Sequence, residues 1–245
     1  MKRLTSYYFQ DPCTPIMESL IDLHTFIMFY VVGIVVLVSL ALILVVYEFY
    51  LVQPPQLSDS LQARTVIHCT WLELFWTTAP AAILVSIALP SFALLYAMEE
   101  KGDYHLSVKA IGHQWYWEYQ LVADYRWLTS LVQFTFDSYM VSDDSLEVGQ
   151  FRLLEVDRKL VLPVNTPIRV LTSSADVIHS WALPAAGVKM DAIPGRLNQV
   201  NLYFNRSGIF YGQCSELCGV NHGFMPICLK IVLPTDFNNR FLNSQ

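Results

Sequence analysis

Residues 214–225 have the sequence Cys214-Ser-Glu-Leu-Cys218-Gly-Val-Asn-His222-Gly-Phe-Met225, which places four potential metal ligands within twelve residues. Thiolates and thioethers are soft ligands that favour copper, and imidazole suits copper as well. One Cys with two His and a weak Met is typical of a mononuclear blue-copper site. Here two cysteines lie four residues apart on one tight loop, so both can bridge a pair of copper ions.

Three other interpretations of this stretch stay open on the ligand types alone. A structural zinc site needs four Cys or His ligands in closed tetrahedral geometry. His179 could supply the fourth ligand, but Met225 would then have no role, because zinc sites do not use thioethers. The remaining interpretations are a disulfide that joins Cys214 to Cys218 across a very small loop, and two free cysteines that are simply buried. Copper is favoured because it accounts for all four residues.

An additional histidine lies upstream of this loop, in Ala175-Asp-Val-Ile-His179-Ser-Trp. Copper-binding Greek-key sandwiches take one His from an earlier loop and their other ligands from a late loop between two strands. The apolar residues that alternate on either side of the late loop are Val200, Leu202 and Phe204 before it, and Ile227, Leu229 and Ile231 after it. A period of two predicts half-buried strands. A histidine beside Val and Ile can also be a core residue, but the late cluster favours His179 as a ligand.

Two long apolar stretches distinguish this chain from an ordinary soluble protein. The chain has 245 residues, of which 54% are hydrophobic and only 15% charged, a composition that indicates a membrane portion. Residues 26–47 and 74–98 contain no charged residue, and each exceeds the roughly 20 residues that a helix needs to cross a bilayer. Pro80 and Pro90 in the second stretch are tolerated in membrane helices. The sequence therefore predicts a transmembrane hairpin with its turn at Pro54-Pro55.

The first apolar stretch is predicted to be retained rather than cleaved as a signal peptide. Its lead-in is too long and too acidic for a typical basic n-region, and no Arg-rich transit segment precedes it. Two spans place both termini on one side of the membrane. The arm carries Lys2 and Arg3 while the connecting loop has only Arg64, so the positive-inside rule weakly opposes an external C-terminal domain.

From Glu99 onward the character of the chain changes to short alternating runs broken by Gly and Pro. The runs are Val108 to Leu121, Phe151 to Leu162, Val164 to Leu171 and Gly208 to Gly212. Many short strands predict a sandwich or barrel, and about 145 residues can bury a single core. We therefore expect a polar N-terminal arm at 1–25, a transmembrane helical hairpin at 26–98 and an all-β domain at 99–245.

Charge and cysteine content argue against a nucleic-acid-binding protein and against a disulfide-rich protein. From Glu99 onward the chain has 15 Asp and Glu and 12 Lys and Arg. This modest negative net charge is normal for a solvated surface and compatible with a basic partner. No basic patch exists in the sequence, so nucleic acid is disfavoured. The five cysteines are odd in number and scattered, which argues against a disulfide framework. Cys13, Cys69 and Cys228 are interpreted as structural.

One aromatic segment, Gly112-His-Gln-Trp115-Tyr-Trp117-Glu-Tyr119, has two interpretations. Trp and Tyr collect where a protein meets the membrane interface, so this can be a core strand with interfacial rings. Alternatively, Trp115 is a surface residue that passes electrons from a docked partner.

Taken together, these features resemble subunit II of cytochrome c oxidase along nearly the whole chain. Besides the helical hairpin, the matching motifs are Gly112-His-Gln-Trp-Tyr-Trp117, Phe136-Asp-Ser-Tyr-Met140, Arg152-Leu-Leu-Glu-Val-Asp157, Ala175-Asp-Val-Ile-His179, Asp191-Ala-Ile-Pro-Gly-Arg-Leu-Asn-Gln199 and Gly208-Ile-Phe-Tyr-Gly-Gln-Cys-Ser-Glu-Leu-Cys-Gly219. The resemblance implies a cupredoxin-like Greek-key domain that holds the dinuclear copper A centre. In the family pattern Cys214 and Cys218 bridge both coppers, and His179 and His222 each cap one.

The resemblance also implies roles for residues around the centre. Met225 and the backbone carbonyl of Glu216 would be weak axial ligands, and the Glu216 carboxylate would reach a magnesium ion shared with subunit I. Trp115 would be the point at which electrons enter. The remaining implied residues are Asp137 and Asp176, in the acidic docking patch for cytochrome c, and Glu73, near a proton-uptake channel of subunit I. The family pattern has more carboxylates between Tyr119 and Phe136, and Arg126 would oppose a basic partner, so the patch is expected to be smaller or shifted.

The implied function is electron transfer within complex IV of the respiratory chain. The chain would accept electrons from reduced cytochrome c and pass them to haem in subunit I, where oxygen is reduced to water and protons are pumped; alone it would not turn over. A membrane-tethered copper carrier is the alternative, whereas quinol-oxidising relatives lack Cys214 and Cys218. We expect the mitochondrial inner membrane with the C-terminal domain in the intermembrane space, or else a bacterial plasma membrane.

Overall fold

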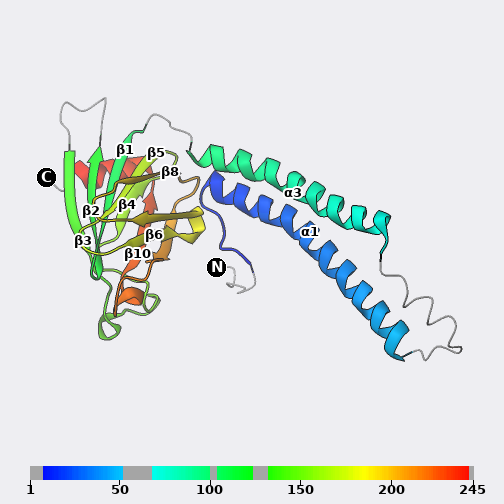
Figure 1. The fold of residues 1–245 in the computed structure, drawn as a ribbon. Coiled ribbons are helices and arrows are strands. Elements are labelled where there is room, and N and C mark those ends of the chain that lie inside the picture. Colours follow the sequence, from blue (N-terminus) through cyan, green and yellow to red (C-terminus); the bar gives the residue numbers. More distant parts are fainter. Residues whose placement is uncertain (1–7, 52–67, 100–103, 124–131, 243–245) are drawn as a thin grey trace, which may run out of the picture. The chain divides into compact units, whose positions relative to one another are not determined.

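The computed structural model describes residues 8–51, 68–99, 104–123 and 132–242 (Figure 1). These residues form two compact units. One unit comprises Ile21–Leu95, and the other joins Met1–Leu20 to Tyr96–Gln245. The predicted turn at Pro54-Pro55 lies outside the described residues, as do Lys2, Arg3, Arg64 and Arg126.

The first unit contains the two predicted apolar helices. They are α1 (Pro15–Val46), which continues into a π-helical turn η1 (Tyr47–Leu51), and α3 (Thr70–Glu99). Both are long and apolar enough to cross a membrane, and their large apolar side chains, such as Leu44 and Leu89, are exposed. A hydrogen bond of 2.7 Å joins Tyr30 Oη on α1 to Ser86 Oγ on α3. Apolar side chains on the outside of a helix pair are what a lipid environment requires, so the two predicted apolar helices are confirmed.

The second unit is an all-β sandwich with short helical turns. Its strands are β1 (Leu106–His113), β2 (Tyr116–Ala123), β3 (Val132–Ser138), β4 (Leu160–Pro163), β5 (Pro167–Ser174), β6 (His179–Leu183), β7 (Val188–Ala192), β8 (Asn198–Tyr203), β9 (Gly208–Gln213) and β10 (Pro226–Val232). Its helical elements are η2 (Asp143–Ser145), η3 (Pro184–Ala186), η4 (His222–Phe224) and α4 (Pro234–Leu242).

The strands form three sheets around one core. The largest has the order β3-β2-β1-β5-β8, the second β4-β10-β9, and the third is the β6-β7 hairpin. The pairs β1-β5 and β4-β10 are parallel and the others are antiparallel. Buried side chains from all three sheets belong to one cluster, for example Ile168 from the first, Leu229 from the second and Trp181 from the third.

Period-two alternation correctly predicted the strands on either side of the late loop. Strands β8 and β10 form where the alternation lies. The alternating side chains are all buried, and they are Val200, Leu202 and Phe204 on and just after β8, and Ile227, Leu229 and Ile231 on β10. The run Gly208 to Gly212 likewise lies in β9, whereas the run Val108 to Leu121 is two strands, because the chain turns between β1 and β2.

The prediction of a strand over Phe151 to Leu162 is wrong. Only the end of this run forms β4, and the preceding residues form turns. The reason lies at Glu155, whose side chain is buried. Tyr211 Oη donates a hydrogen bond of 3.1 Å to Glu155 Oε2, and Lys159 forms an ion pair with the same carboxylate. A buried carboxylate needs such partners, and these contacts hold residues 151–159 in a compact turn.

The N-terminal arm is part of the β unit. The amide of Cys13 donates to Ala185 O at 2.9 Å, and the amide of Asn205 donates to Cys13 O at 3.0 Å. Arg206 donates from Nε to Pro12 O and from Nη2 to Asp11 O, both at 2.8 Å. These contacts join the residues before α1 to the η3 turn and to the turn that precedes β9.

Helix α1 begins directly from this attachment. Thr14 accepts a hydrogen bond from the amide of Met17 at 3.1 Å, and its hydroxyl donates to Ala186 O at 2.7 Å. A Thr at the N-cap followed by Pro15 is a typical helix start, because the hydroxyl satisfies a free amide and proline has none. The same residue therefore starts the helix and binds the β unit.

Candidate metal centre

Two neighbouring strands bring the predicted ligands together. His179 is the first residue of β6, and Cys214 follows the last residue of β9. The two strands are antiparallel neighbours at this end, because Trp181 and Cys214 form a β-bridge and the Ser215 amide donates to Ser180 O at 3.0 Å. A histidine and a cysteine that are far apart in the sequence therefore meet at one end of the β6-β9 pair.

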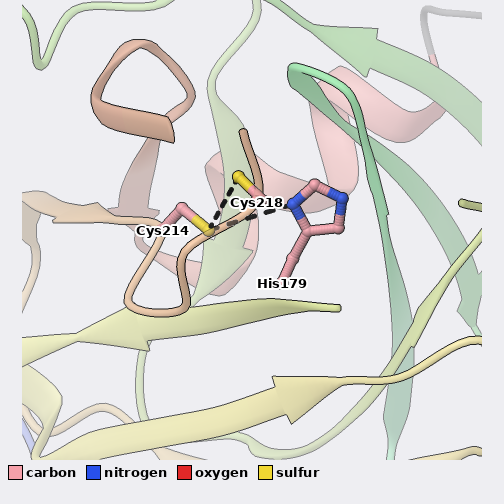
Figure 2. A group of neighbouring side chains, drawn as sticks. All are labelled: His179, Cys214 and Cys218. Carbon is pink, nitrogen blue, oxygen red and sulfur yellow. Dashed lines mark hydrogen bonds between the residues drawn. The ribbon is translucent and has the colours of Figure 1, made fainter. Parts of the chain in front are cut away.

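The potential ligand atoms lie close enough together to bind the same metal ion. Among the residues described, His179, Cys214 and Cys218 form a buried group whose ligand atoms all lie within 4.8 Å of one another (Figure 2). The Cys214 Sγ atom is 3.9 Å from Cys218 Sγ and 3.9 Å from His179 Nδ1. Cys218 Sγ is 3.5 Å from His222 Nδ1 and 3.6 Å from Met225 Sδ. All the side chains predicted as copper ligands thus converge.

This donor set fits copper better than the alternatives. A sulfur–sulfur distance of 3.9 Å is far longer than the roughly 2.05 Å of a disulfide, and both thiols are free. It is shorter than two metal–sulfur bonds of about 2.3 Å each, so one ion can contact both sulfurs. The Glu216 carbonyl lies 3.3 Å from Cys214 Sγ. Soft sulfur ligands, two imidazoles and a carbonyl are a set that suits copper.

The two thiols differ in acidity. Burial opposes ionisation of Cys214, but hydrogen bonds with His179 and with the Glu216 backbone outweigh it and lower the pKa of this thiol to about 6. Burial and the neighbouring charge on Cys214 raise the pKa of Cys218 to about 12. Without a metal, the pair therefore holds one negative charge readily and a second one only at high pH. Binding of a cation as a dithiolate must release a proton.

Trp115 lies against the loop that carries Cys214 and Cys218. It occupies the turn between β1 and β2, partly buried against the core. Its Nε1 donates to Cys218 O at 3.3 Å, and Gln114 Nε2 donates to the same oxygen at 2.9 Å. The partly buried Trp115 is thus one hydrogen bond away from the backbone of Cys218, which is predicted to be a ligand.

The other expected residues have different surroundings. Met225 is buried, and its carbonyl accepts a hydrogen bond of 3.2 Å from Trp117 Nε1. Glu216 is exposed. Asp137 on β3 accepts a 3.5 Å hydrogen bond from Tyr139 Oη. Glu73 lies in the helical unit, in the first turn of α3, and its Oε1 is 2.7 Å from His68 Nδ1.

Asp176 contacts His179. Its Oδ1 lies 2.9 Å from His179 Nε2, and its Oδ2 accepts a hydrogen bond of 2.7 Å from the Gln114 amide. Burial acts to raise the pKa of Asp176, but the hydrogen bonds from His179, Val177 and Gln114 outweigh it and hold the pKa below its ordinary value. Burial likewise acts to lower the pKa of His179, and its bonds to Cys214 and Asp176 raise it overall.

Sequence reasoning missed the roles of Gly112 and Gln114. A Cβ atom on Gly112 would lie 2.7 Å from His179 Cδ2, so β1 can approach the histidine only with glycine there. Gln114 joins Asp176 through its backbone and Cys218 through its side chain. The only signal in the sequence was their place in the aromatic motif beside Trp115.

Comparisons with known proteins match both units. The model for "Cytochrome C oxidase subunit II, transmembrane domain" matches residues 3–94, and the one for "Cytochrome C oxidase subunit II, periplasmic domain" matches residues 106–232. Cytochrome c oxidase subunit 2 of Oenothera berteroana is 49% identical over 232 residues, which cover 94% of this chain and 87% of the relative. The protein of that name from Cyanidium caldarium is 49% identical over 230 residues, with coverage of 94% and 87%.

A solved structure agrees with the β unit. The periplasmic domain of subunit II of cytochrome oxidase from Bradyrhizobium japonicum has 46% sequence identity and a TM-score of 0.50, and the match covers 58% of this chain and 94% of that chain. The predicted combination of two apolar helices and a cupredoxin-like β domain is therefore confirmed. The chain belongs to the cytochrome c oxidase subunit II family and is a subunit of a haem-copper oxidase.

Proposed function

We propose that this chain accepts electrons one at a time from reduced cytochrome c and passes them to haem in subunit I, where oxygen is reduced to water and protons are pumped. The observation that carries the proposal is the convergence of two thiols, two imidazoles and a thioether at one end of the β6-β9 pair. A dinuclear copper group bound there supplies one-electron redox chemistry with the charge spread over two ions.

The side chains of the centre have distinct tasks in this proposal. Cys214, Cys218, His179 and His222 would hold the copper group. Met225 and the backbone carbonyl of Glu216 would be weaker ligands. The strands on either side hold these residues in fixed positions, which keeps the rearrangement on electron transfer small. The two cysteines are only 6% and 4% exposed, which argues against a carrier that must exchange its metal.

Electron transfer into the centre is assigned to Trp115. Its indole is only partly buried and its Nε1–H donates to Cys218 O, which gives a short path from a docked partner to a bridging ligand. The carboxylates of Asp137 and Asp176 supply negative charge for a basic partner. We expect the exposed Glu216 carboxylate to bind magnesium at the contact with subunit I.

The helical unit anchors the chain in the membrane. Glu73, at the start of α3, is assigned to the entrance of a proton-uptake channel in subunit I. We place the protein in the mitochondrial inner membrane with the β unit in the intermembrane space, and the bacterial plasma membrane is the second possibility. The other subunits of complex IV are the remaining partners.

Metal analysis of the purified oxidase tests the copper assignment. We expect two coppers attributable to this chain, a purple colour in the oxidised form and an electron spin spread over both ions. One copper per chain, or zinc in its place, would reject the proposal.

A kinetic experiment tests the role of Trp115. Trp115→Phe removes the indole N–H while keeping an aromatic ring, so electron transfer from cytochrome c should slow while the absorption spectrum of the centre is unchanged. Wild-type kinetics in this variant would remove Trp115 from the path.

A further inference from the structure

The Asp176 carboxylate contacts the candidate metal centre, although the residue itself is exposed. Asp176 lies between β5 and β6, three residues before His179. Its Oδ1 accepts a hydrogen bond of 2.6 Å from the Val177 amide and lies 2.9 Å from His179 Nε2. Its Oδ2 accepts a hydrogen bond of 2.7 Å from the Gln114 amide. Both oxygens are therefore occupied by groups of this chain.

We propose that Asp176 is a positioning residue that fixes the orientation and tautomer of His179. The imidazole is fully buried, and Figure 2 shows one ring nitrogen facing the sulfurs and the other pointing away from them. A carboxylate that accepts a hydrogen bond from Nε2–H keeps the proton on Nε2 and leaves the lone pair on Nδ1, the atom that lies 3.9 Å from Cys214 Sγ. Metal-binding histidines commonly need such a partner. The inference rests on the proposed function, because it gives Nδ1 a metal to bind.

The same carboxylate also holds the segment that carries Trp115. The Gln114 amide donates to Asp176, while the Gln114 side chain and the Trp115 indole both donate to Cys218 O. Asp176 therefore connects a histidine ligand with the turn on the other side of the centre. Loss of the carboxylate should loosen both at once.

Asp137 provides a matched comparison, because it is an acidic residue of the same unit whose side chain accepts a long hydrogen bond, from Tyr139 Oη at 3.5 Å. Its charge is available to a partner, and it lies on β3 rather than beside a ligand. If both aspartates act only through charge, neutralising either should have the same consequences.

The experiment compares Asp176→Ala, Asp176→Asn and Asp137→Asn in the purified oxidase. Absorption and spin-resonance spectra, the reduction potential and copper retention against a chelator are measured beside the salt dependence of electron transfer from cytochrome c. Asp176→Ala should lower copper affinity by about 10- to 100-fold and change the spectra. Asp176→Asn should have a smaller effect in the same direction, because an amide oxygen can still accept a hydrogen bond from Nε2–H. Asp137→Asn should alter only the salt dependence.

The outcomes separate the two proposals. If Asp176→Ala has wild-type spectra, potential and copper retention, Asp176 acts only through its surface charge and the inference is wrong. Should Asp176→Ala fail to fold, Asp176→Asn preserves the shape of the side chain but has one acceptor oxygen for the two donors, His179 Nε2 and the Gln114 amide. Wild-type values in that variant would therefore overturn the inference. A wild-type oxidase that lacks the pair of coppers would instead overturn the proposed function.

Discussion

The two ends of the β6-β9 strand pair are held in different ways. At the metal end, His179 and Cys214 meet through their side chains. At the arm end, the η3 turn after β6 and the turn before β9 bind backbone groups of the N-terminal arm, through Ala185 O and the Arg206 side chain. The metal end depends on which side chains are present, whereas the arm end depends mainly on where the backbone lies.

Each end also has a glycine that admits its partner. A Cβ atom on Gly112 would lie 2.7 Å from His179 Cδ2, and one on Gly187 would lie 2.7 Å from Leu20 Cδ1 and 3.2 Å from Met17 Cα. Gly187 also has φ of 68°, a conformation that favours glycine. A Gly→Ala substitution at Gly112 or at Gly187 therefore perturbs one end or the other by the same added methyl group.

The largest effect is expected from Cys218→Ser, which breaks the metal end. A serine oxygen is a harder ligand than a thiolate and holds copper poorly, so the copper content should fall below two per chain and the purple colour should disappear. Metal analysis and absorption measure both. Cys69→Ser, at an exposed cysteine outside the β unit, is the control. A fully loaded, purple Cys218→Ser protein would contradict the bridging role.

The second prediction sets Gly112→Ala against Gly187→Ala. Each added methyl group overlaps a packed neighbour, so both should destabilise the protein by about 1–3 kcal/mol, measured by thermal unfolding. Gly112→Ala should also change the copper spectrum, because it displaces His179. If Gly187→Ala alters the copper spectrum as strongly as Gly112→Ala does, the claim that the two ends are held independently is wrong.

A smaller loss is expected from Arg206→Ala at the arm end. This change removes both hydrogen bonds to Asp11 and Pro12, which we expect to contribute about 1–2 kcal/mol. Cys13 is fully buried, and burial raises the pKa of its thiol to about 12, so it reacts only when the arm opens. Alkylation of Cys13, followed by mass spectrometry, should become about 5- to 30-fold faster.

Lys189→Ala is the control for this experiment, because Lys189 is exposed and pairs with Asp191 rather than with the arm. Equal labelling rates in wild type and Arg206→Ala would show that the two hydrogen bonds do not hold the arm.

The smallest effect is expected from Met225→Leu. The thioether is assigned as a weak axial ligand, so both coppers should remain, and loss of a donor should destabilise the oxidised form and raise the reduction potential. A redox titration followed by absorption measures the shift. A variant that loses its copper would show that Met225 is a strong ligand.

The convergence of side chains at the metal end could be predicted from the sequence, because these side chains belong to rare residue types at short spacing. Cys214, Cys218, His222 and Met225 lie on one loop, and alternation on both sides predicted the strands that hold it. His179 was predicted from its position ahead of that loop. The contact of Asp176 with this histidine could not be predicted, because an aspartate before a strand is equally common as a surface residue, and only the distance to His179 Nε2 distinguishes the two.

The arm end could not be predicted for a physical reason. Its acceptors are main-chain carbonyls of Asp11 and Pro12, and every residue has such a carbonyl, so no residue pattern marks them. The wrong strand at Phe151 to Leu162 has a related cause. The alternation there was apolar enough for a strand, but the buried Glu155 and its partners Tyr211 and Lys159 determine the turn.

The attachment of the arm has a consequence for the order in which this protein can be completed. The ribosome makes Cys13 early, yet the groups that bind it, at Ala185 and Asn205, emerge only after both spans and most of the sandwich have been made. Contacts between such distant parts of a chain form late, because a long loop must close first. Cys13 is therefore made before its partners and is among the last residues to reach their final positions.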